Sequence, residues 1–223
     1  MKFSEFAHHI VIGDEMIVFD EIGDKYWILP PHQTDEVIKS INAESACSSS
    51  VVNDLMKAGL LVQGEQPRGI NFSSNNVRSI DNHEWSYSFK SGITQVRRIL
   101  LFQSALALIS VCLGIKLLGL HRTLNILRRT KNSLNNQNTF DHHYISEISS
   151  GIKQASKFIP FKTSCLQHAL GVCFLSATKG ADVCMKIGVK NYDFIAHAWA
   201  EADCTVIGDR PDLPELLHVI FSI

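Results

Sequence analysis

Short apolar runs separated by turn residues open the chain. Ile10–Ile12, Met16–Phe19 and Lys25–Leu29 predict three strands, with Gly13-Asp14 and Gly23-Asp24 as the turns between them. Pro30-Pro31 follows, and because proline cannot continue a strand ladder, we expect the strand region to end there.

Helical spacing replaces the strand pattern after the prolines. Thr34-Asp35 predicts the start of a first helix, which continues through apolar residues to Ile41. Ser48 or Ser49 then opens a second helix, and Leu60–Val62 predicts a short closing strand after Gly59. We therefore expect residues 1–75 to form one compact domain, with residues 76–223 as the second. The polar segment Gly64–Ser91 is expected to link them.

Ile99–Leu120 is the longest apolar stretch and is long enough to cross a bilayer. Polar residues interrupt it, and basic residues flank both of its ends instead of one. A buried helix, or a pair of helices, in the second domain accounts for such a stretch equally well. We favour the buried interpretation over a membrane span and expect no membrane contact.

A cysteine stands at the predicted start of a later helix. Ser164 followed by Gln167 has the form of a capping box, and apolar residues recur at helical spacing as far as Ala177. Cys165 would then occupy the first helical position, where unpaired amides and the helix dipole favour the thiolate. The alternative is that Cys165 is a small buried apolar residue, as most free cysteines are.

Asp193–Glu201 alternates as a strand and places His197 on the same face as Trp199 and Glu201. If a turn centred on Asp203 joins it to a second strand, Glu201 opposes Thr205, and Trp199 opposes Ile207. His197 then opposes Asp209. Asp209 would orient the imidazole while His197 accepts the proton of Cys165, the arrangement of a nucleophilic triad.

Composition narrows the remaining classes. Lysines and arginines number 21 against 22 acidic residues and form no stripe interleaved with aromatic residues, so no nucleic-acid partner is expected. Six cysteines without a C-x-x-C spacing, in a chain without a secretory signal, predict reduced thiols and a cytoplasmic protein. We expect no metal and no cofactor, since no phosphate loop or ligand cluster stands out.

The order of a helix-borne cysteine, a His-Ala-Trp-x-Glu strand and an aspartate on the next strand resembles the transglutaminase-like, papain-related proteins. More narrowly, Ser164–Leu166, Ala196–Trp199 and Gly208-Asp209 resemble the lasso-peptide B proteins, cysteine proteases that remove the leader from a precursor peptide. The resemblance implies an α+β fold with a papain-like second domain. It also implies Cys165 as nucleophile, His197 as base and Asp209 as orienting acid.

The first domain resembles a winged helix and also the peptide-recognition element of peptide-modifying enzymes. Such an element binds a leader peptide as an added strand at an open sheet edge. The resemblance suggests the strand Lys25, Tyr26, Trp27, Ile28 and Leu29 as that edge. A DNA-binding winged helix and a purely structural cap are the alternatives, but Lys57 is the single cation of the second helix, which disfavours DNA.

The resemblance implies a leader peptidase of lasso-peptide biosynthesis. Its partners would be the precursor peptide, with its leader and core, and an asparagine-synthetase-like cyclase that consumes ATP. Two other functions stay open: a transglutaminase-like acyl transferase using the same three residues, and a non-catalytic peptide chaperone.

Overall fold

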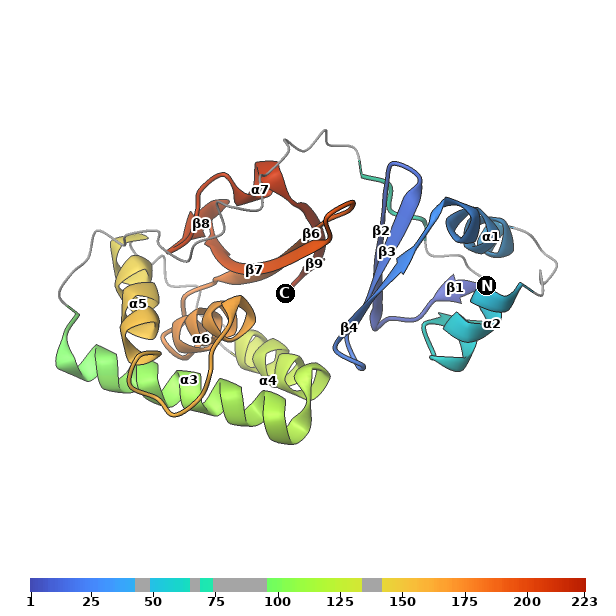
Figure 1. Ribbon diagram of the computed structural model, residues 1–223. Helices are drawn as coiled ribbons and strands as arrows, with labels where there is room; N and C mark the ends of the chain where they lie inside the picture. The colour runs from blue at the N-terminus through green and yellow to red at the C-terminus, as the bar shows by residue number, and fades with distance from the viewer. Residues whose placement is uncertain (43–48, 65–68, 74–95, 134–141) are drawn as a thin grey trace. The chain divides into compact units, whose positions relative to one another are not determined.

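The structure is a computed structural model that describes residues 1–42, 49–64, 69–73, 96–133 and 142–223 (Figure 1). Its contacts divide the chain into two compact units. The first comprises Met1–Asn76 with Lys190–Ile195, and the second comprises Val77–Val189 with Ala196–Ile223. The expected linker, Gly64–Ser91, lies for the most part outside the described residues, and the boundary between residues 75 and 76 stays a prediction.

A three-stranded antiparallel sheet forms the centre of the first unit. Its strands are β2 (Ala7–Ile12), β3 (Glu15–Asp20) and β4 (Lys25–Leu29), in the order β2-β3-β4. A separate pair joins β1 (Lys2–Phe3) to β5 (Leu61–Val62). The three strands and the short closing strand expected from the apolar runs are confirmed. The winged-helix assignment itself stays a prediction.

The first helix, α1 (Pro31–Asn42), begins three residues before the predicted start at Thr34. The prediction was wrong because proline is tolerated in the first turn of a helix, where its missing N–H leaves no bond unmade. Thr34 is instead a buried contact between elements. Its hydroxyl accepts a hydrogen bond from the Met16 amide at 2.9 Å and donates one to the Leu29 carbonyl at 3.0 Å.

The second helix, α2 (Ser50–Lys57), begins as predicted at one of the two serines. Ser49 is its N-cap, and the Ser49 hydroxyl accepts a hydrogen bond from the Val52 amide at 3.3 Å. Val52 and Leu55 then point into the core of the unit, where they are fully buried with residues of β3 and α1. Local capping and apolar spacing therefore agree at this helix.

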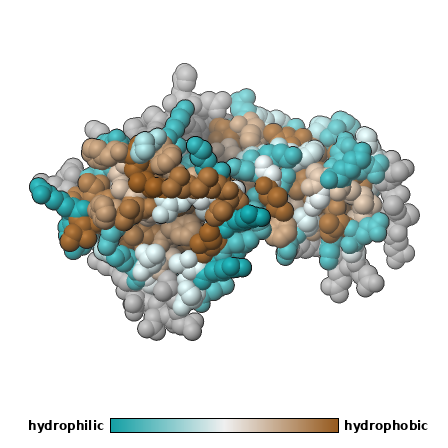
Figure 2. All heavy atoms as spheres, turned by 90° about the horizontal axis from the view of Figure 1, so that it is seen from below, coloured by the Kyte–Doolittle hydropathy of each residue, from teal (hydrophilic) through white to brown (hydrophobic). Residues whose placement is uncertain are grey.

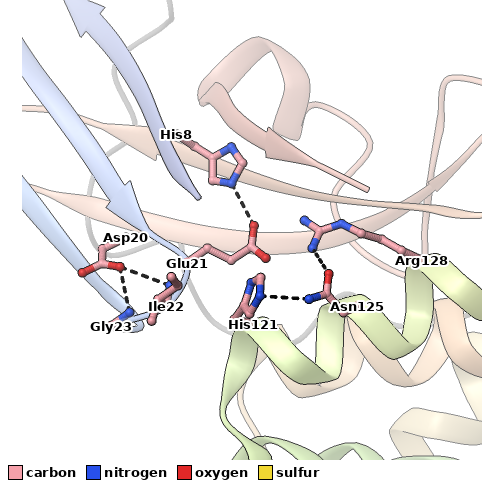
Figure 3. A network of polar contacts seen from close by, with 8 residues as sticks. All are labelled: His8, Asp20, Glu21, Ile22, Gly23, His121, Asn125 and Arg128. Carbon is pink, nitrogen blue, oxygen red and sulfur yellow. Dashed lines mark hydrogen bonds and ion pairs between the residues drawn. The ribbon is translucent and has the colours of Figure 1, made fainter. Parts of the chain in front are cut away.

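Polar contacts fix the end of β3 (Figure 3). Glu21 is fully buried, and its carboxylate meets Nε2 of His8 at 2.9 Å. Asp20 accepts hydrogen bonds from the amides of Ile22 and Gly23, at 3.1 and 2.7 Å. These bonds hold the turn that leads from β3 into β4 and so fix where β4 begins.

The second unit contains a four-stranded sheet in the order β8-β7-β6-β9. Its strands are β6 (Cys184–Lys190), β7 (Ile195–Ala202), β8 (Thr205–Ile207) and β9 (His218–Ser222). The short helix α7 (Leu213–Leu216) precedes β9 near the end of the described chain.

Four helices pack together on one side of this sheet (Figure 1). They are α3 (Arg98–Leu118), α4 (Leu120–Ser133), α5 (His142–Ala155) and α6 (Cys165–Thr178). The helix α6 is apolar on nearly all sides and lies among α3, α4 and α5. A Cβ atom at Gly171 of α6 would stand only 3.2 Å from Ile152 of α5, so a small residue allows these two helices to approach closely.

The long apolar stretch is one helix, α3, which ends before Gly119. The buried-helix interpretation is correct for one face only. That face carries the stripe Leu100, Ser104, Leu108, Val111 and Cys112. The opposite face is exposed, although α3 has a mean hydropathy of 2.0 and is long enough to cross a membrane.

The next helix, α4, carries a polar row in which His121 meets Asn125 at 2.9 Å and Asn125 meets Arg128 at 2.7 Å (Figure 3).

Candidate active site

Cys165 lies at the first position of α6, as the capping signal predicted. Ser164 has an extended backbone conformation, and its amide donates a hydrogen bond to the Gln167 side chain at 2.8 Å. This is the contact by which the third helical residue of a capping box secures the residue before the helix. The thiol therefore stands at the positive end of the helix, half-buried and next to amides that have no partner within the helix.

The predicted register of the hairpin that carries His197 is wrong by one residue. Ala202 pairs with Thr205, Glu201 with Val206 and Ala200 with Ile207. Asp203 and Cys204 both have positive φ angles, 47° and 60°, which is the backbone of a two-residue turn. A turn centred on Asp203 alone would have required three residues. Continued regularly, the observed register would place Arg210, and not Asp209, opposite His197.

The turn at Gly208 compensates for this one-residue difference in register. Strand β8 ends at Ile207, and Gly208 has a φ of 70°, a conformation that other residues rarely adopt. The chain turns there, and the Asp209 carboxylate meets Nε2 of His197 at 2.7 Å. There is also no room for a side chain at this position, because a Cβ atom would overlap the hydroxyl of Ser149 on α5. The contact expected from the sequence is thus made by a different backbone route.

Cys165 and His197 are joined by a hydrogen bond. Burial raises the pKa of the Cys165 thiol, but the hydrogen bond and positive charge of His197 outweigh it. Hydrogen bonds from the amides of Ala198 and Leu166 add to their effect, and the thiol pKa is lowered overall. With Nε2 directed at Asp209, Nδ1 is the ring nitrogen left for the sulfur.

Burial alone would lower the pKa of His197, but the hydrogen bonds to Asp209 and Cys165 raise that pKa to about 9. The proton on the imidazole is therefore kept through neutral pH and is lost as pH rises through about 9. Cys165 is a thiolate when the pH is above its own lowered pKa. Between these two limits the pair is a thiolate facing an imidazolium, the reactive form of a nucleophilic cysteine.

Both oxygens of the Asp209 carboxylate are engaged. One meets His197, and the other accepts a hydrogen bond from the Arg210 amide at 2.8 Å. The Arg210 guanidinium is itself paired with Asp212, at 2.7 and 3.0 Å. The charge of Asp209 is therefore directed to the imidazole, while its orientation is fixed by its own backbone.

Trp199 and Glu201, the other large residues of the His-Ala-Trp-x-Glu pattern, hold β7 in place. Trp199 is fully buried, and its indole donates to Glu201 at 3.2 Å. Lys186 on β6 meets the same carboxylate at 2.6 Å. A Cβ atom at Gly188 of β6 would stand 2.7 Å from the Trp199 ring, so the absence of a side chain there makes room for the indole. These contacts make Glu201 a positioning residue for β7.

His168 was missed by the sequence analysis, although its spacing of three from Cys165 places both on one side of α6. Its Nε2 lies 3.3 Å from the Thr163 hydroxyl. Burial, followed by the charge of Lys153, lowers the pKa of His168 to about 4, and the charge of Asp209 opposes this only in part. A second imidazole, neutral at pH 7, therefore lies close to the candidate triad. No three His, Cys, Asp or Glu side chains of the described residues are grouped to hold a metal ion.

The predicted peptide-binding residues Lys25, Tyr26, Trp27, Ile28 and Leu29 form β4, which has β3 as its one strand neighbour in the described part of the chain. Ile28 is 46% exposed, whereas Leu29 is buried. The Tyr26 ring stacks on Phe19 at 5.0 Å, and the Lys25 ammonium lies 4.9 Å from the Trp27 ring. The strand is therefore an ordered sheet edge, and its role in binding stays a prediction.

The model of the transglutaminase-like superfamily matches residues 105–222, which include Cys165, His197 and Asp209. Over 83 residues the chain is 28% identical to the microcin J25-processing protein McjB of Escherichia coli. That alignment covers 37% of this chain and 40% of the relative, so the match spans less than half of the relative's length. No solved structure matches the chain. The resemblance to the lasso-peptide B proteins is confirmed by these matches.

Gly208→Ala tests whether the turn after β8 holds Asp209 against the imidazole. The added methyl meets both an unfavourable φ and the Ser149 side chain, so the turn must move and the pKa of His197 should fall. We expect the rate at which iodoacetamide alkylates Cys165 at pH 7, followed by peptide mass spectrometry, to fall at least about tenfold as the thiolate is lost.

Gly59→Ala is the matched control for this substitution. Gly59 has a φ of 72°, but no atom lies within 4 Å of its added methyl, and it belongs to the first unit. It should cost about 1 kcal/mol of stability and leave the alkylation of Cys165 unchanged. Equal alkylation rates in Gly208→Ala and the unsubstituted protein would show that the turn does not set the site.

Proposed function

Because the chain belongs to the transglutaminase-like superfamily, we propose that it is a cysteine peptidase that removes the leader from a lasso-peptide precursor. One observation carries the proposal: Cys165 at a helix start, His197 and Asp209 form a continuous hydrogen-bonded chain. The similarity to a microcin-processing protein supports the class of substrate.

In the proposed mechanism the Cys165 thiolate attacks the carbonyl carbon of the bond between leader and core. The carbonyl π electrons move to oxygen, and the oxyanion forms beside the first turn of α6. The Cys165 amide is one donor for this oxyanion, because preorganised backbone N–H groups stabilise such charge. The Leu166 and Ala198 amides, which hydrogen-bond the sulfur before attack, keep the nucleophile ionised and oriented.

The imidazolium of His197 then donates its proton to the departing amine of the core, and the C–N bond breaks. This leaves the leader as a thioester on Cys165. The neutral imidazole next accepts a proton from a water molecule, which attacks the thioester and frees the leader as a carboxylic acid. The 2.7 Å bond to Asp209 keeps the ring oriented in both steps and stabilises its charged form.

The first unit supplies the leader site in this proposal. The leader adds to the open edge of β4 as a further strand, so that main-chain hydrogen bonds give affinity and side-chain contacts give selectivity. Ile28 is the most exposed apolar side chain of this strand and is the contact we assign to the leader. The released core amine passes to a separate asparagine-synthetase-like cyclase in the cytoplasm, which closes the ring at the expense of ATP.

The direct test incubates a candidate precursor and its cyclase with the protein and identifies products by mass spectrometry. With ATP withheld, so that the cyclase cannot close the ring, the unsubstituted protein should release two pieces whose masses sum to the precursor plus one water. Cys165→Ala should reduce the cleavage rate roughly a thousandfold or more, since it removes the nucleophile. Cys204→Ala, which alters an exposed cysteine in the same unit, should cleave at the normal rate.

A product joined to an amine through a new amide would instead identify an acyl transferase. Cleavage that survives Cys165→Ala would contradict the peptidase altogether and favour a peptide chaperone acting beside another protease.

Ile28→Asp tests the leader site apart from the chemistry. If a leader side chain packs on Ile28, burying a carboxylate there should weaken the binding of a fluorescent leader peptide at least about tenfold in anisotropy titrations. At saturating leader, the cleavage rate should stay normal, since β4 carries none of the reacting groups.

Ile22→Asp is the control for this variant, because Ile22 is 61% exposed and lies in the same unit but outside the sheet. It should change leader affinity by less than about twofold. If both substitutions weaken leader binding equally, or if neither weakens it, the β4 edge is not the leader site.

A further inference from the structure

The outward face of α3 is mostly apolar and is interrupted by the exposed Ser110 between Leu106 and Leu113. The residues Ile99, Phe102, Leu106, Leu113 and Leu117 follow one another at helical spacing and are 38–74% exposed. Figure 2 shows hydrophobic side chains gathered in a band on this side of the molecule. A soluble protein seldom exposes so many large apolar side chains along one helix unless something covers them. We refer to these five residues as the α3 face.

A groove of about 620 Å³ opens beside the α3 face. Its walls come from three helices of the second unit: Leu113 and Leu117 of α3, Ile126 of α4, and Phe174 and Leu175 of α6. The lining is mostly apolar, and its polar members are Gln103, Ser110, Thr123, Thr178 and Lys179. Its volume falls in the range of pockets that hold small apolar ligands. The groove does not involve Cys165, His197 or Asp209, so the peptidase mechanism leaves it without a role.

Charge distinguishes this surface from the rest of the chain. Residues 97–133 contain seven lysines and arginines and no aspartate or glutamate, although the whole chain is nearly neutral. Exposed cations stand at both ends of the α3 face: Arg98 before it, Lys116 next to its last residue, and Arg122 after it. Arg97 is engaged with Glu147 at 3.0 Å and is left out of this count. An apolar helix face with cations at its margins matches a surface of apolar chains and anionic headgroups.

We propose that the α3 face is a docking surface for an anionic lipid bilayer. The helix would lie in the plane of the interface, its apolar side chains among the acyl chains, its terminal cations at the headgroups, and an acyl chain in the groove. Because α3 also contacts α4, α5 and α6 along its buried stripe, it would remain part of the folded unit and would not span the bilayer. This replaces the expectation of no membrane contact and does not depend on the proposed peptidase activity.

Aliphatic composition favours lipid over a protein as the occupant. Phe102 is the one aromatic residue on the α3 face, whereas the centres of protein interfaces are enriched in aromatic residues and arginine. Acyl chains adapt to an aliphatic surface without needing a complementary shape. A partner protein, or a second copy of the chain, is therefore treated below as an outcome that overturns the proposal.

The test is sedimentation of the full chain with large vesicles. We expect binding to vesicles of phosphatidylglycerol and phosphatidylcholine mixed in equal parts, weak binding to phosphatidylcholine alone, and loss of binding as salt is raised. Arg98→Gln with Arg122→Gln should weaken binding by roughly 25-fold. This corresponds to about fivefold for each cation, or roughly 1 kcal/mol per charge at an anionic surface. Lys39→Gln with Lys57→Gln, exposed lysines of the first unit, should have little effect.

Depth of contact is measured with tryptophan reporters. In Phe102→Trp the added fluorescence should be quenched by brominated acyl chains, whereas in Ile22→Trp, an equally exposed site of the first unit, it should not. Phe102→Gln with Leu117→Gln should abolish sedimentation with vesicles while circular dichroism and leader cleavage in solution stay unchanged. Normal cleavage by this variant would separate a failure of the docking surface from a failure of the peptidase.

Several results would overturn the proposal. These are absence of binding to anionic vesicles at low salt, equal binding by the variants, or quenching at both reporter sites. Retention in the bilayer after carbonate extraction would indicate a spanning helix. A dimer in analytical ultracentrifugation that dissociates in Phe102→Gln with Leu117→Gln would assign the face to a second copy. Binding of the cyclase that is lost in that variant, without binding to vesicles, would assign the face to that protein.

Discussion

The contact between His197 and Asp209 is the constraint on which the site depends. A buried imidazole is ordinarily neutral at pH 7, because desolvation disfavours its charged form. Here a carboxylate at 2.7 Å reverses that preference and holds the pKa at about 9. The His197 ring holds the proton that the Cys165 thiol loses. The reactivity of the sulfur is therefore set by Asp209, an acid that it does not touch. Any displacement of Asp209 would act on the nucleophile through the ring.

The fold brings these groups together from elements that differ in character. Cys165 belongs to α6, a helix buried among three others, and small residues such as Gly171 let those helices approach closely. His197 belongs to a central strand, whose place is fixed by Trp199 and by the pair of Glu201 with Lys186. Asp209 stands on a turn. The helix and the strand are rigid because they are buried, whereas the turn depends on one glycine.

Local signals in the sequence were sufficient for much of this arrangement. The capping pattern at Ser164 located the start of α6, and alternation located β7, because both depend on residues close together in the chain. The hairpin register was wrong, since nothing in the residue types distinguishes a turn of Asp203 alone from one of Asp203 and Cys204. His197 and Asp209 still meet because the turn at Gly208 compensates for the one-residue difference in register. That compensation depends on a positive φ and on packing against Ser149, neither of which can be read from local pattern.

Other misses have the same origin in tertiary contacts. Periodicity could show that α3 is apolar all round, but not which of its faces the neighbouring helices would cover. His168 was overlooked because its spacing of three from Cys165 shows only that both residues lie on one side of α6. Its proximity to Asp209 depends on how α6 meets the turn after β8. In the first unit, the strands were predicted within a few residues, and the start of α1 was missed because Pro31 was taken as a terminator.

The most direct measurement is the titration of the His197 ring by nitrogen-15 NMR, with His197→Gln used to assign the signals among the ten histidines. We expect an imidazolium through neutral pH that loses its proton near pH 9, and a fall of this pKa in both Asp209→Asn and Cys165→Ala. A ring that titrates near the ordinary value of about 6.5, unchanged by Asp209→Asn, would contradict the ion pair and the nucleophile built on it.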